Sequence, residues 1–388
     1  MKDRAVLVLG GYGVFGRLIC ESLIRAGIDV ILAGRDAAAA GRVASGLGPR
    51  AHSARLDVQS AGLARELAAI DPLLVVNTAG PFQARDYSVP RACIASGISY
   101  IDLADARAYV AGIGALDADA RSHGVLVTSG ASTCPALSTA IVDQIGSGLR
   151  LEEVSFGIAP GLRQARGLAT ARAVLGYCGK RIPVFLQGAR QQRGGWSGTV
   201  RHDFPPPVGR RWLSRVDLPE QALWPARYPS LSRIESRAGV EPAILHLGLV
   251  ALTWLVRARL SSSLAPHAER LLRVAALFEN RGSATGAMFV RVEGVDDAGV
   301  RHRRTWSIVA ERGDGLRIPV AAAIAVSKRL VGIPGYPALR ARGALPCLGL
   351  LSAGEILAEL DGHAIRTQLR EEAPPQSGKR SRSTAAGT

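Results

Sequence analysis

Residues 5–16 read AVLVLGGYGVFG, a short apolar run that leads into a glycine-rich turn. The turn has the spacing G-x-G-x-x-G, and residues 15–26 then show apolar side chains at helical spacing before a glycine. In this pattern the first glycine forms the tight turn, the second lets a pyrophosphate approach the backbone, and the third lets the helix pack on the sheet. The free N–H groups at the helix start then face the diphosphate. The predicted dinucleotide-binding residues of this turn are Gly11, Tyr12, Gly13, Val14, Phe15 and Gly16.

Further β-branched runs follow along the first 130 residues. Near-continuous apolar stretches at residues 5–9, 29–33, 73–77, 99–103 and 125–128 are typical of buried parallel strands, and helical patterns lie between them. Strict alternation of strand and helix predicts an α/β fold, a Rossmann-type doubly wound parallel sheet.

The pattern changes after residue 128 and predicts a second, α+β domain. Ser132 and Pro135 predict a helix start that continues to about residue 145, whereas residues 151–237 show weak periodicity and receive no assignment. Two helices are expected within 242–280, a hairpin at 286–311, and a late helix that opens with a capping box at Ser352 and Glu355. We therefore expect domains at 1–131 and 132–371, with the last helices able to pack back on the first domain, and a disordered tail at 372–388.

The charge of the 388-residue chain is concentrated in its second half. The formal net charge is +16; residues 1–130 carry 13 Lys and Arg against 12 Asp and Glu, so the excess lies in 131–388. A basic second half suits an anionic small molecule, a phospholipid surface or nucleic acid, and a solvated basic face explains it equally well. No recognition motif accompanies the arginines, which argues against nucleic acid.

Five scattered cysteines without C-x-x-C spacing, and an N-terminus without a long apolar region, indicate a cytoplasmic chain with no metal site.

The ends of the next strands predict how a dinucleotide is held. Arg35 follows the second strand and can pair with a 2′-phosphate, whereas Asp36 is read as the cap of the next helix, so NADP(H) is favoured over NAD(H). Asp57, after the third strand, can accept a hydrogen bond from the adenine amino group or can be a surface turn residue. The small residues Thr78, Ala79 and Gly80 after the fourth strand let the ribose and nicotinamide pass close to the backbone.

Six motifs together resemble a known family. They are GGYGVFG (10–16), AGRD (33–36), RLDV (55–58), NTAGPF (77–82), YIDL (100–103) and SGASTCPALSTA (129–140). In combination they resemble the saccharopine dehydrogenase-like NADP-binding oxidoreductases over residues 5–145. The resemblance implies a Rossmann domain, a second α+β domain over the nicotinamide, and hydride transfer. It does not carry over a substrate, since members act on amino acids or on lipid intermediates.

Candidate proton donors lie after the fifth strand. No lysine has a tyrosine four residues before it, which excludes the Tyr-x-x-x-Lys mechanism of short-chain dehydrogenases. Asp102 and Asp105 occupy the carboxyl end of a strand, where open α/β sheets bind ligands, although Asp105 could instead cap the following helix. Cys134 at a predicted helix start would have a lowered thiol pKa, but a buried small residue is the favoured interpretation.

We therefore expect an NAD(P)H-dependent oxidoreductase that transfers hydride to an unidentified substrate, either acidic or lipid-linked. The alternative is a non-catalytic NADP-binding protein that docks on a lipid surface. A homodimer and peripheral membrane contact are both left open.

Residues 243–256 (AILHLGLVALTWLV) form one long apolar run. Fourteen residues reach only about 21 Å as a helix, against roughly 30 Å of hydrocarbon, so a membrane span is disfavoured. The helical wheel is apolar almost all round, which favours a buried core helix. Arg257 and Arg259 follow at once, so attachment to anionic lipid stays open.

Overall fold

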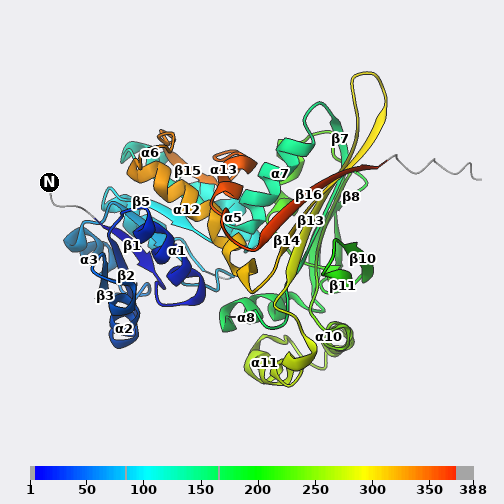
Figure 1. Ribbon diagram of the computed structural model, residues 1–388, viewed down its shortest axis with the longest axis horizontal. Coiled ribbons are helices and arrows are strands. Elements are labelled where there is room, and N and C mark those ends of the chain that lie inside the picture. Colours follow the sequence, from blue (N-terminus) through cyan, green and yellow to red (C-terminus); the bar gives the residue numbers. More distant parts are fainter. Residues whose placement is uncertain (1–4, 84, 165–166, 373–388) are drawn as a thin grey trace, which may run out of the picture.

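The computed structural model describes residues 5–83, 85–164 and 167–372. Two β-sheets organise these residues, with helices packed between and around them (Figure 1). The predicted disordered tail begins at residue 372, but Glu372 is the last residue of a strand. Residues 373–388 of that prediction lie outside the described residues.

The first sheet has seven strands in the order β15-β6-β5-β4-β1-β2-β3, and every pair in it is parallel. Its strands are β1 (Val6–Leu9), β2 (Val30–Gly34), β3 (Ala51–Arg55), β4 (Leu74–Asn77), β5 (Ser99–Asp102), β6 (Leu126–Ser129) and β15 (Gly343–Pro346). The predicted doubly wound parallel sheet is confirmed, and the strand order reverses between β1 and β4. The seventh strand, β15, was not predicted, because four residues among turns carry too little periodicity.

Helices cover both faces of this sheet, because alternate residues of β1 point to opposite sides. Val6 and Val8 face the apolar cluster that includes α1, whereas Leu7 and Leu9 face the cluster that includes α3 and α4. The helices here are α1 (Val14–Arg25), α2 (Ala37–Leu47), α3 (Leu63–Ile70), α4 (Ser88–Ala95), α5 (Arg107–Gly112), α6 (Asp117–Ser122) and α12 (Ile318–Val331), with the 3-10 turn η1 (Ile113–Leu116). Helix α12 comes from late in the chain and packs against α1 and β4.

The second sheet is mixed, and most of it comes from the unassigned stretch. Its main path is β10-β11-β12-β7-β13-β14-β16, and β8 pairs with β12 and with β9. The strands are β7 (Arg150–Ala159), β8 (Arg181–Leu186), β9 (Ala189–Gly194), β10 (Val200–Phe204), β11 (Gly209–Arg215), β12 (Arg233–Ala238), β13 (Gly286–Val295), β14 (Arg301–Ala310) and β16 (Ile365–Glu372). The predicted hairpin is confirmed as the antiparallel pair β13–β14.

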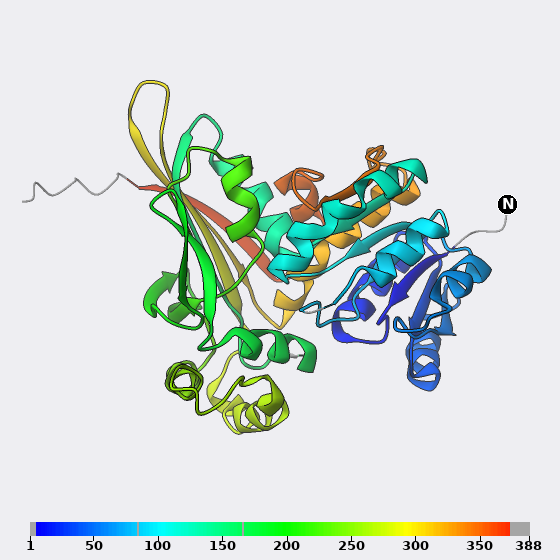
Figure 2. The ribbon, with the colours of Figure 1, turned by 180° about the vertical axis from the view of Figure 1, so that it is seen from behind.

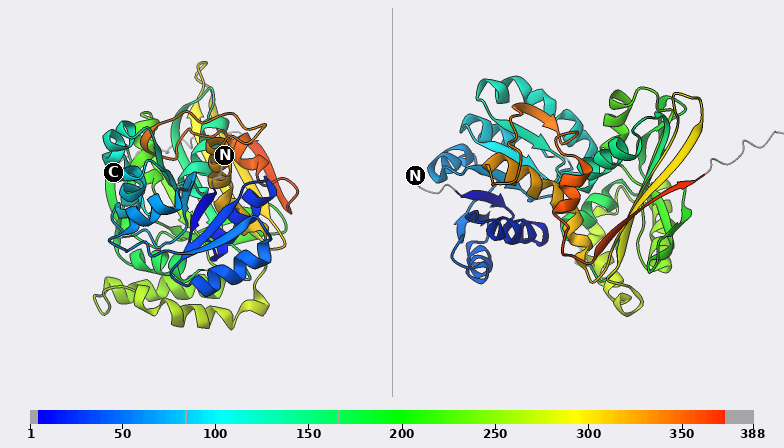
Figure 3. Two further views of the ribbon diagram at one scale, coloured as in Figure 1. Left: turned by 90° about the vertical axis from the view of Figure 1, so that its left-hand side faces the viewer. Right: turned by 45° about the horizontal axis from the view of Figure 1, so that its top comes forward.

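Helices between the two sheets join them into one body (Figure 3, right). The ring of Trp224 in α9 (Glu220–Arg227) packs in a tilted geometry against Phe156 of β7, with 5.3 Å between the ring centroids. Its indole N–H donates a hydrogen bond of 2.9 Å to Thr139 of α7 (Ser138–Ile145). One apolar cluster extends from the first sheet through these helices to the second sheet. The remaining helices are α8 (Leu168–Tyr177), α10 (Ala243–Arg257), α11 (Ala268–Ala276) and α13 (Ala353–Ala358). The predicted capping box at the start of α13 is present.

The helix predicted to start at Ser132 begins later than expected. Residues Thr133–Leu137 form an irregular turn, Cys134 is extended at φ −123° and ψ 120°, and the side chain of Ser132 makes no capping bond. A residue before proline is disfavoured in the helical region, so Pro135 delays the regular helix to Ser138. The favoured interpretation of Cys134 is confirmed: it is buried, and burial raises the pKa of its thiol well above the usual value.

Helix α10 contradicts the prediction of a buried core helix. His246 and Thr253 are its only buried residues, whereas four of its large apolar side chains are exposed: Ile244, Leu247, Trp254 and Leu255. The sequence placed apolar residues almost all round the helix and so gave no sign of which face would meet the protein. None of the described helices is long and apolar enough to cross a membrane.

Candidate functional site

The glycine-rich turn between β1 and α1 leaves its centre open. A Cβ atom at Gly11 would lie 2.9 Å from Leu32 Cα, and one at Gly16 would overlap the carbonyl oxygen of Gly10, so internal packing requires both glycines. At Gly13 the nearest atom to such a Cβ is Gly10 O at 3.1 Å. Gly13 is exposed and precedes α1 without a side-chain cap, and no acidic residue lies in the first helical turn. The turn therefore fits a diphosphate, since the N–H groups at the helix start face outward.

Tyr12 and Val14 border this turn on its outer side. The ring of Tyr12 occupies the space that a side chain at Gly34 would need, and its hydroxyl accepts a 3.4 Å hydrogen bond from the N–H of Asp36. Val14 is exposed, whereas Phe15 packs against the core. The turn is thereby held against the end of β2.

Asp36 and Arg35 have different roles at that end of β2. Asp36 Oδ1 accepts a 2.9 Å hydrogen bond from the N–H of Ala39, which confirms the prediction that Asp36 caps α2. Arg35 is exposed and pairs with no described residue. The guanidinium at the end of β2 is therefore free, while the neighbouring carboxylate is engaged in the cap.

Asp57 lies in the turn after β3. The N–H of Leu56 donates to the carbonyl of Gly34 over 3.0 Å, which brings this turn next to the end of β2. Asp57 is exposed, and its Oδ1 accepts a 3.0 Å hydrogen bond from the N–H of Gln59. The carboxylate thus stabilises a surface turn, and contact with adenine stays a prediction.

The loop that contains Thr78, Ala79 and Gly80 lies beside the glycine turn. A Cβ atom at Gly10 would come within 2.8 Å of Thr78 Oγ1, and that hydroxyl donates a 2.8 Å hydrogen bond to the carbonyl of Leu9. On its other side the loop reaches α8, since a Cβ atom at Gly80 would lie 3.9 Å from the Cβ of Ala169. The structure therefore brings the predicted residues after β1 and β4 together. Helix α8, which follows β7 in the chain, lies beside this loop.

Asp102 is fully buried at the end of β5. Its Oδ1 accepts hydrogen bonds from the N–H of Ala104 (2.9 Å), the N–H of Gly130 (2.9 Å) and the hydroxyl of Ser129 (2.8 Å). Its Oδ2 has no partner among the described residues, and burial raises the pKa of the carboxyl to about 6. Asp102 thus fastens the end of β5 to the loop after β6, and its catalytic role stays a prediction.

Asp105 lies at the junction of the two halves and is only partly buried. Its Oδ1 accepts a 3.2 Å hydrogen bond from Gln83 Nε2, on the loop after β4. Burial raises the pKa of Asp105, the bond from Gln83 lowers it in part, and the charge of Asp217 raises it further. The alternative that Asp105 caps the next helix is wrong, because Ala106 is the cap residue of α5 and no side chain bonds there.

Two carboxyl groups that the sequence did not single out lie near Asp105. Asp217 Oδ1 accepts from Arg107 Nε over 2.6 Å. Glu220 is fully buried, and its Oε1 accepts a 2.5 Å hydrogen bond from the hydroxyl of Ser138. Burial raises the pKa of Glu220 to about 7, and the charge of Asp105 adds to the shift. Residues 217–220 (DLPE) are typical of a helix start, a signal that does not point to a site.

Tyr177, at the end of α8, is coupled electrostatically to two of these carboxyl groups. Burial raises its pKa well above the usual value, and the charges of Asp105 and Asp217 contribute. We refer to Asp105, Asp217, Glu220 and Tyr177 as the acidic cluster. It adjoins the loop after β4 and contains donors and acceptors from both halves of the chain.

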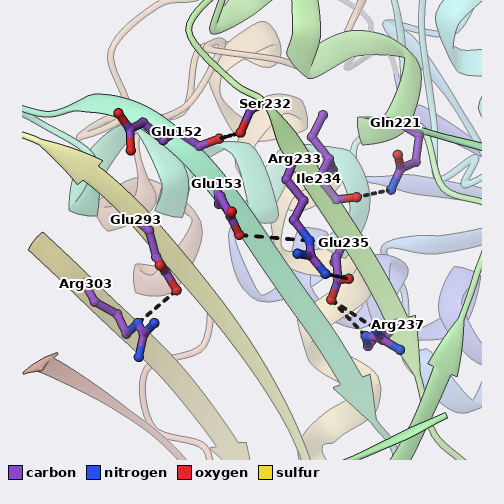
Figure 4. A network of polar contacts seen from close by, with 10 residues as sticks. All are labelled: Glu152, Glu153, Gln221, Ser232, Arg233, Ile234, Glu235, Arg237, Glu293 and Arg303. Carbon is purple, nitrogen blue, oxygen red and sulfur yellow. Dashed lines mark hydrogen bonds and ion pairs between the residues drawn. The ribbon is translucent and has the colours of Figure 1, made fainter. Parts of the chain in front are cut away.

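Many cations of the basic half are neutralised in ion pairs on the second sheet (Figure 4). Arg303 lies 2.8 Å from Glu293, and Glu235 accepts from Arg233 at 2.6 Å and from Arg237 at 3.0 Å. These residues come from β14, β13 and β12, and Glu153 of β7 lies between them. This part of the sheet is therefore a balanced network of charges and not a cationic surface.

Comparison with known proteins identifies the first domain. The saccharopine dehydrogenase NADP binding domain family matches residues 6–128. The structure of saccharopine dehydrogenase (L-Glu forming) from Saccharomyces cerevisiae aligns with a TM-score of 0.62 at 14% identity, over 95% of this chain and 100% of that chain. Serine dehydrogenase from Escherichia coli aligns with a TM-score of 0.27 at 21% identity, over 32% of this chain and 80% of that chain. None of the curated protein sequences matches. The yeast likeness extends the shared fold to the second sheet.

Proposed function

Because residues 6–128 form a saccharopine dehydrogenase-like NADP-binding domain, we propose that the chain is an NADP(H)-dependent oxidoreductase. The observation that carries the proposal is the open centre of the glycine turn at Gly13, beside the loop of Thr78 and next to the uncapped start of α1. When bound there, the cofactor supplies a hydride to the substrate. No feature of the site specifically favours the second candidate, a non-catalytic NADP-binding protein.

The preference for NADP(H) rests on Arg35. Its guanidinium is exposed at the end of β2, whereas Asp36, the carboxylate that could accept from a free ribose 2′-hydroxyl, caps α2. A free arginine and an engaged carboxylate favour a 2′-phosphate over a 2′-hydroxyl.

The acidic cluster suits a substrate whose reacting group takes up a proton. Hydride addition to a carbonyl, imine or enoyl group leaves negative charge that a positioned acid neutralises. Asp105 has a raised pKa and lies partly exposed between the two halves, so it is better placed than the enclosed Asp102 to meet a substrate. We assign Asp105 as the proton donor or substrate anchor. The acidic or lipid-linked character of the rest of the substrate stays a prediction.

Calorimetry with NADPH and NADH tests the cofactor assignment. We expect tighter binding of NADPH, and Arg35→Ala should weaken NADPH by about 1 to 3 kcal/mol while NADH changes little. Arg42→Ala is the matched control, because Arg42 is also exposed but lies on α2 away from the turn. Equal affinity of the unmutated protein for both nucleotides would contradict the preference, and no binding of either would contradict the function.

A further inference from the structure

Helix α10 buries two polar residues while several of its large apolar side chains stay exposed. His246 and Thr253, seven residues apart, face inward and are fully buried. His246 Nε2 lies 2.9 Å from Ser214 Oγ on β11, and the hydroxyl of Thr253 donates a 2.6 Å hydrogen bond to the carbonyl of Val250. Four of its apolar residues are partly buried and pack against the main apolar cluster: Leu249, Val250, Leu252 and Val256. The inward face of α10 therefore combines polar and apolar contacts, and the remaining apolar side chains lie outside.

The outward face of α10 is a continuous apolar stripe. Exposed residues recur at intervals of three and four along the helix: Ile244, Leu247, Ala251, Trp254 and Leu255. Trp254 is 63% exposed and Ile244 is 59% exposed, so these side chains project into solvent. Soluble surfaces rarely present such a row, and a row of this kind marks a binding surface.

More exposed apolar side chains continue this surface onto the following loop and α11. Leu260 is 77% exposed and Leu277 is 81% exposed, and Val274 on α11 is exposed as well. Both helices lie at the lower end of the molecule in Figures 1 and 2, and they run along that end in the left panel of Figure 3. We call the exposed residues of α10, α11 and their connection the lower surface.

Unpaired cations accompany the apolar residues of the lower surface. Between residues 243 and 282 the chain has five arginines and two glutamates. None of these arginines forms an ion pair with a described residue, and Arg257 lies over the ring of Trp254 at 5.2 Å. The five are Arg257, Arg259, Arg270, Arg273 and Arg281. Of the two glutamates, Glu269 pairs with Arg172 of α8.

We propose that the lower surface binds the headgroup region of an anionic phospholipid bilayer, with α10 lying in the plane of the membrane. A tryptophan ring suits the membrane interface, since it has an apolar body and a polar N–H group. Arginines beside apolar residues can bury the aliphatic part of their side chains in the bilayer and keep their guanidinium groups at the lipid phosphates.

The charge pattern favours a membrane over a second copy of the chain. In a twofold dimer the same patch meets itself, so a surface with five arginines and two glutamates would face a copy that has the same net positive charge. An anionic bilayer instead pairs these cations with phosphates, each contributing about 1 kcal/mol.

The lower surface lies close to the candidate site. A Cβ atom at Gly179 would come within 2.6 Å of the carbonyl of Thr253, so the backbone just after α8 packs directly on α10. Tyr177 of the acidic cluster precedes Gly179 by two residues. A substrate presented by the membrane would thus reach a nearby site, a consequence that rests on the proposed function, whereas membrane binding itself does not.

Co-sedimentation of the full chain with vesicles tests the proposal. We expect binding to phosphatidylcholine vesicles that also contain phosphatidylglycerol at low salt, weaker binding at high salt, and little binding to phosphatidylcholine alone. Trp254→Ser combined with Leu255→Ser should lower the partition coefficient at least about tenfold, since two apolar side chains lose their burial. Arg257→Gln and Arg259→Gln should each lower it about fivefold on the anionic vesicles.

Two controls separate membrane binding from general stickiness and from unfolding. Val300→Ser combined with Leu369→Ser removes apolar side chains that are 53% and 56% exposed elsewhere, and should leave sedimentation unchanged. Every variant should retain NADPH binding, which reports a folded first domain.

Failure of the unmutated protein to sediment with anionic vesicles at low salt would overturn the proposal, whether or not the protein binds NADPH. A dimer in analytical ultracentrifugation that the Trp254→Ser variant dissociates, without vesicle binding, would assign the lower surface to a second copy. Equal loss of binding in the control pair would also contradict a specific surface.

Discussion

Arg107 Nε lies 2.6 Å from Asp217 Oδ1, and this ion pair joins the start of α5 to the segment that precedes α9. Both side chains are about three-quarters buried, with exposed fractions of 26% and 21%. Burial raises the pKa of Asp217 more than Arg107 lowers it. The pair therefore links the nucleotide-binding half to the second half next to Asp105. The ionised carboxylate of Asp217 is stabilised by the charge of Arg107.

Removal of that cation should cost more stability than removal of an exposed one. Arg107→Ala leaves Asp217 partly buried without its partner, so the free energy of unfolding should fall by about 1 to 3 kcal/mol. Arg210→Ala is the control, because Arg210 and Asp203 form a comparable pair at 2.8 Å but are 61% and 69% exposed, so the loss of stability should be clearly smaller. Urea unfolding measures both. Equal losses would show that the Arg107 pair does not tie the two halves together.

Two glycines of the turn should separate folding from binding. Gly16→Ala places a Cβ atom onto the backbone of Gly10, so stability should fall by about 1 to 3 kcal/mol. A Cβ atom at Gly13 meets only Gly10 O at 3.1 Å, whereas the valine side chain of Gly13→Val would extend into the space where the diphosphate would lie. It should abolish NADPH binding with a smaller change in stability. Calorimetry and thermal unfolding of both variants test this, and a Gly13→Val protein that binds NADPH normally would place the diphosphate elsewhere.

The glycine turn and the parallel sheet were predictable because they depend on local sequence. Five of the seven strands of the first sheet are short apolar runs, the exceptions being β3 and β15. The roles of Gly11, Gly16 and Asp36 follow from contacts within a few residues or with the neighbouring strand. The acidic cluster was not predictable, since Asp217 and Glu220 meet Asp105 only through the packing of two domains. Helix α10 shows the same limit: its composition suited a core, but the contact of His246 with Ser214 and the packing of Leu249 and Val250 on the core decide which face points inward.

Asp102 and Asp105 should differ when each is changed to asparagine. Asp105→Asn removes an acid that is partly exposed beside the loop after β4, so turnover should fall by about 10²-fold or more with NADPH affinity nearly unchanged. Asp102→Asn alters a buried residue that holds two loops, so it should chiefly lower the melting temperature. Substrate screening by loss of NADPH absorbance supplies the assay. Unchanged turnover in Asp105→Asn would remove Asp105 from the site.

Glu220 should make the stability of the protein depend on pH. Burial raises its pKa to about 7 in the folded state, whereas in the unfolded chain the pKa is near the ordinary value of about 4.3. Between these two values the folded protein holds the proton and the unfolded chain has lost it, so the free energy of unfolding falls as the pH rises through this window. The total loss from this group is on the order of 3 kcal/mol, present in full above about pH 7.

Glu220→Gln should remove that part of the pH dependence, because a neutral amide does not titrate and can still accept the hydrogen bond from Ser138. Asp102, with a pKa of about 6, contributes in the same direction and is present in both proteins, so the difference between their curves isolates Glu220. Urea unfolding at several values between about pH 5 and pH 8 gives the two curves. They should diverge toward the alkaline end, where the unmutated protein alone must ionise a buried carboxyl group. Parallel curves would mean that Glu220 is ionised in the folded protein throughout this range.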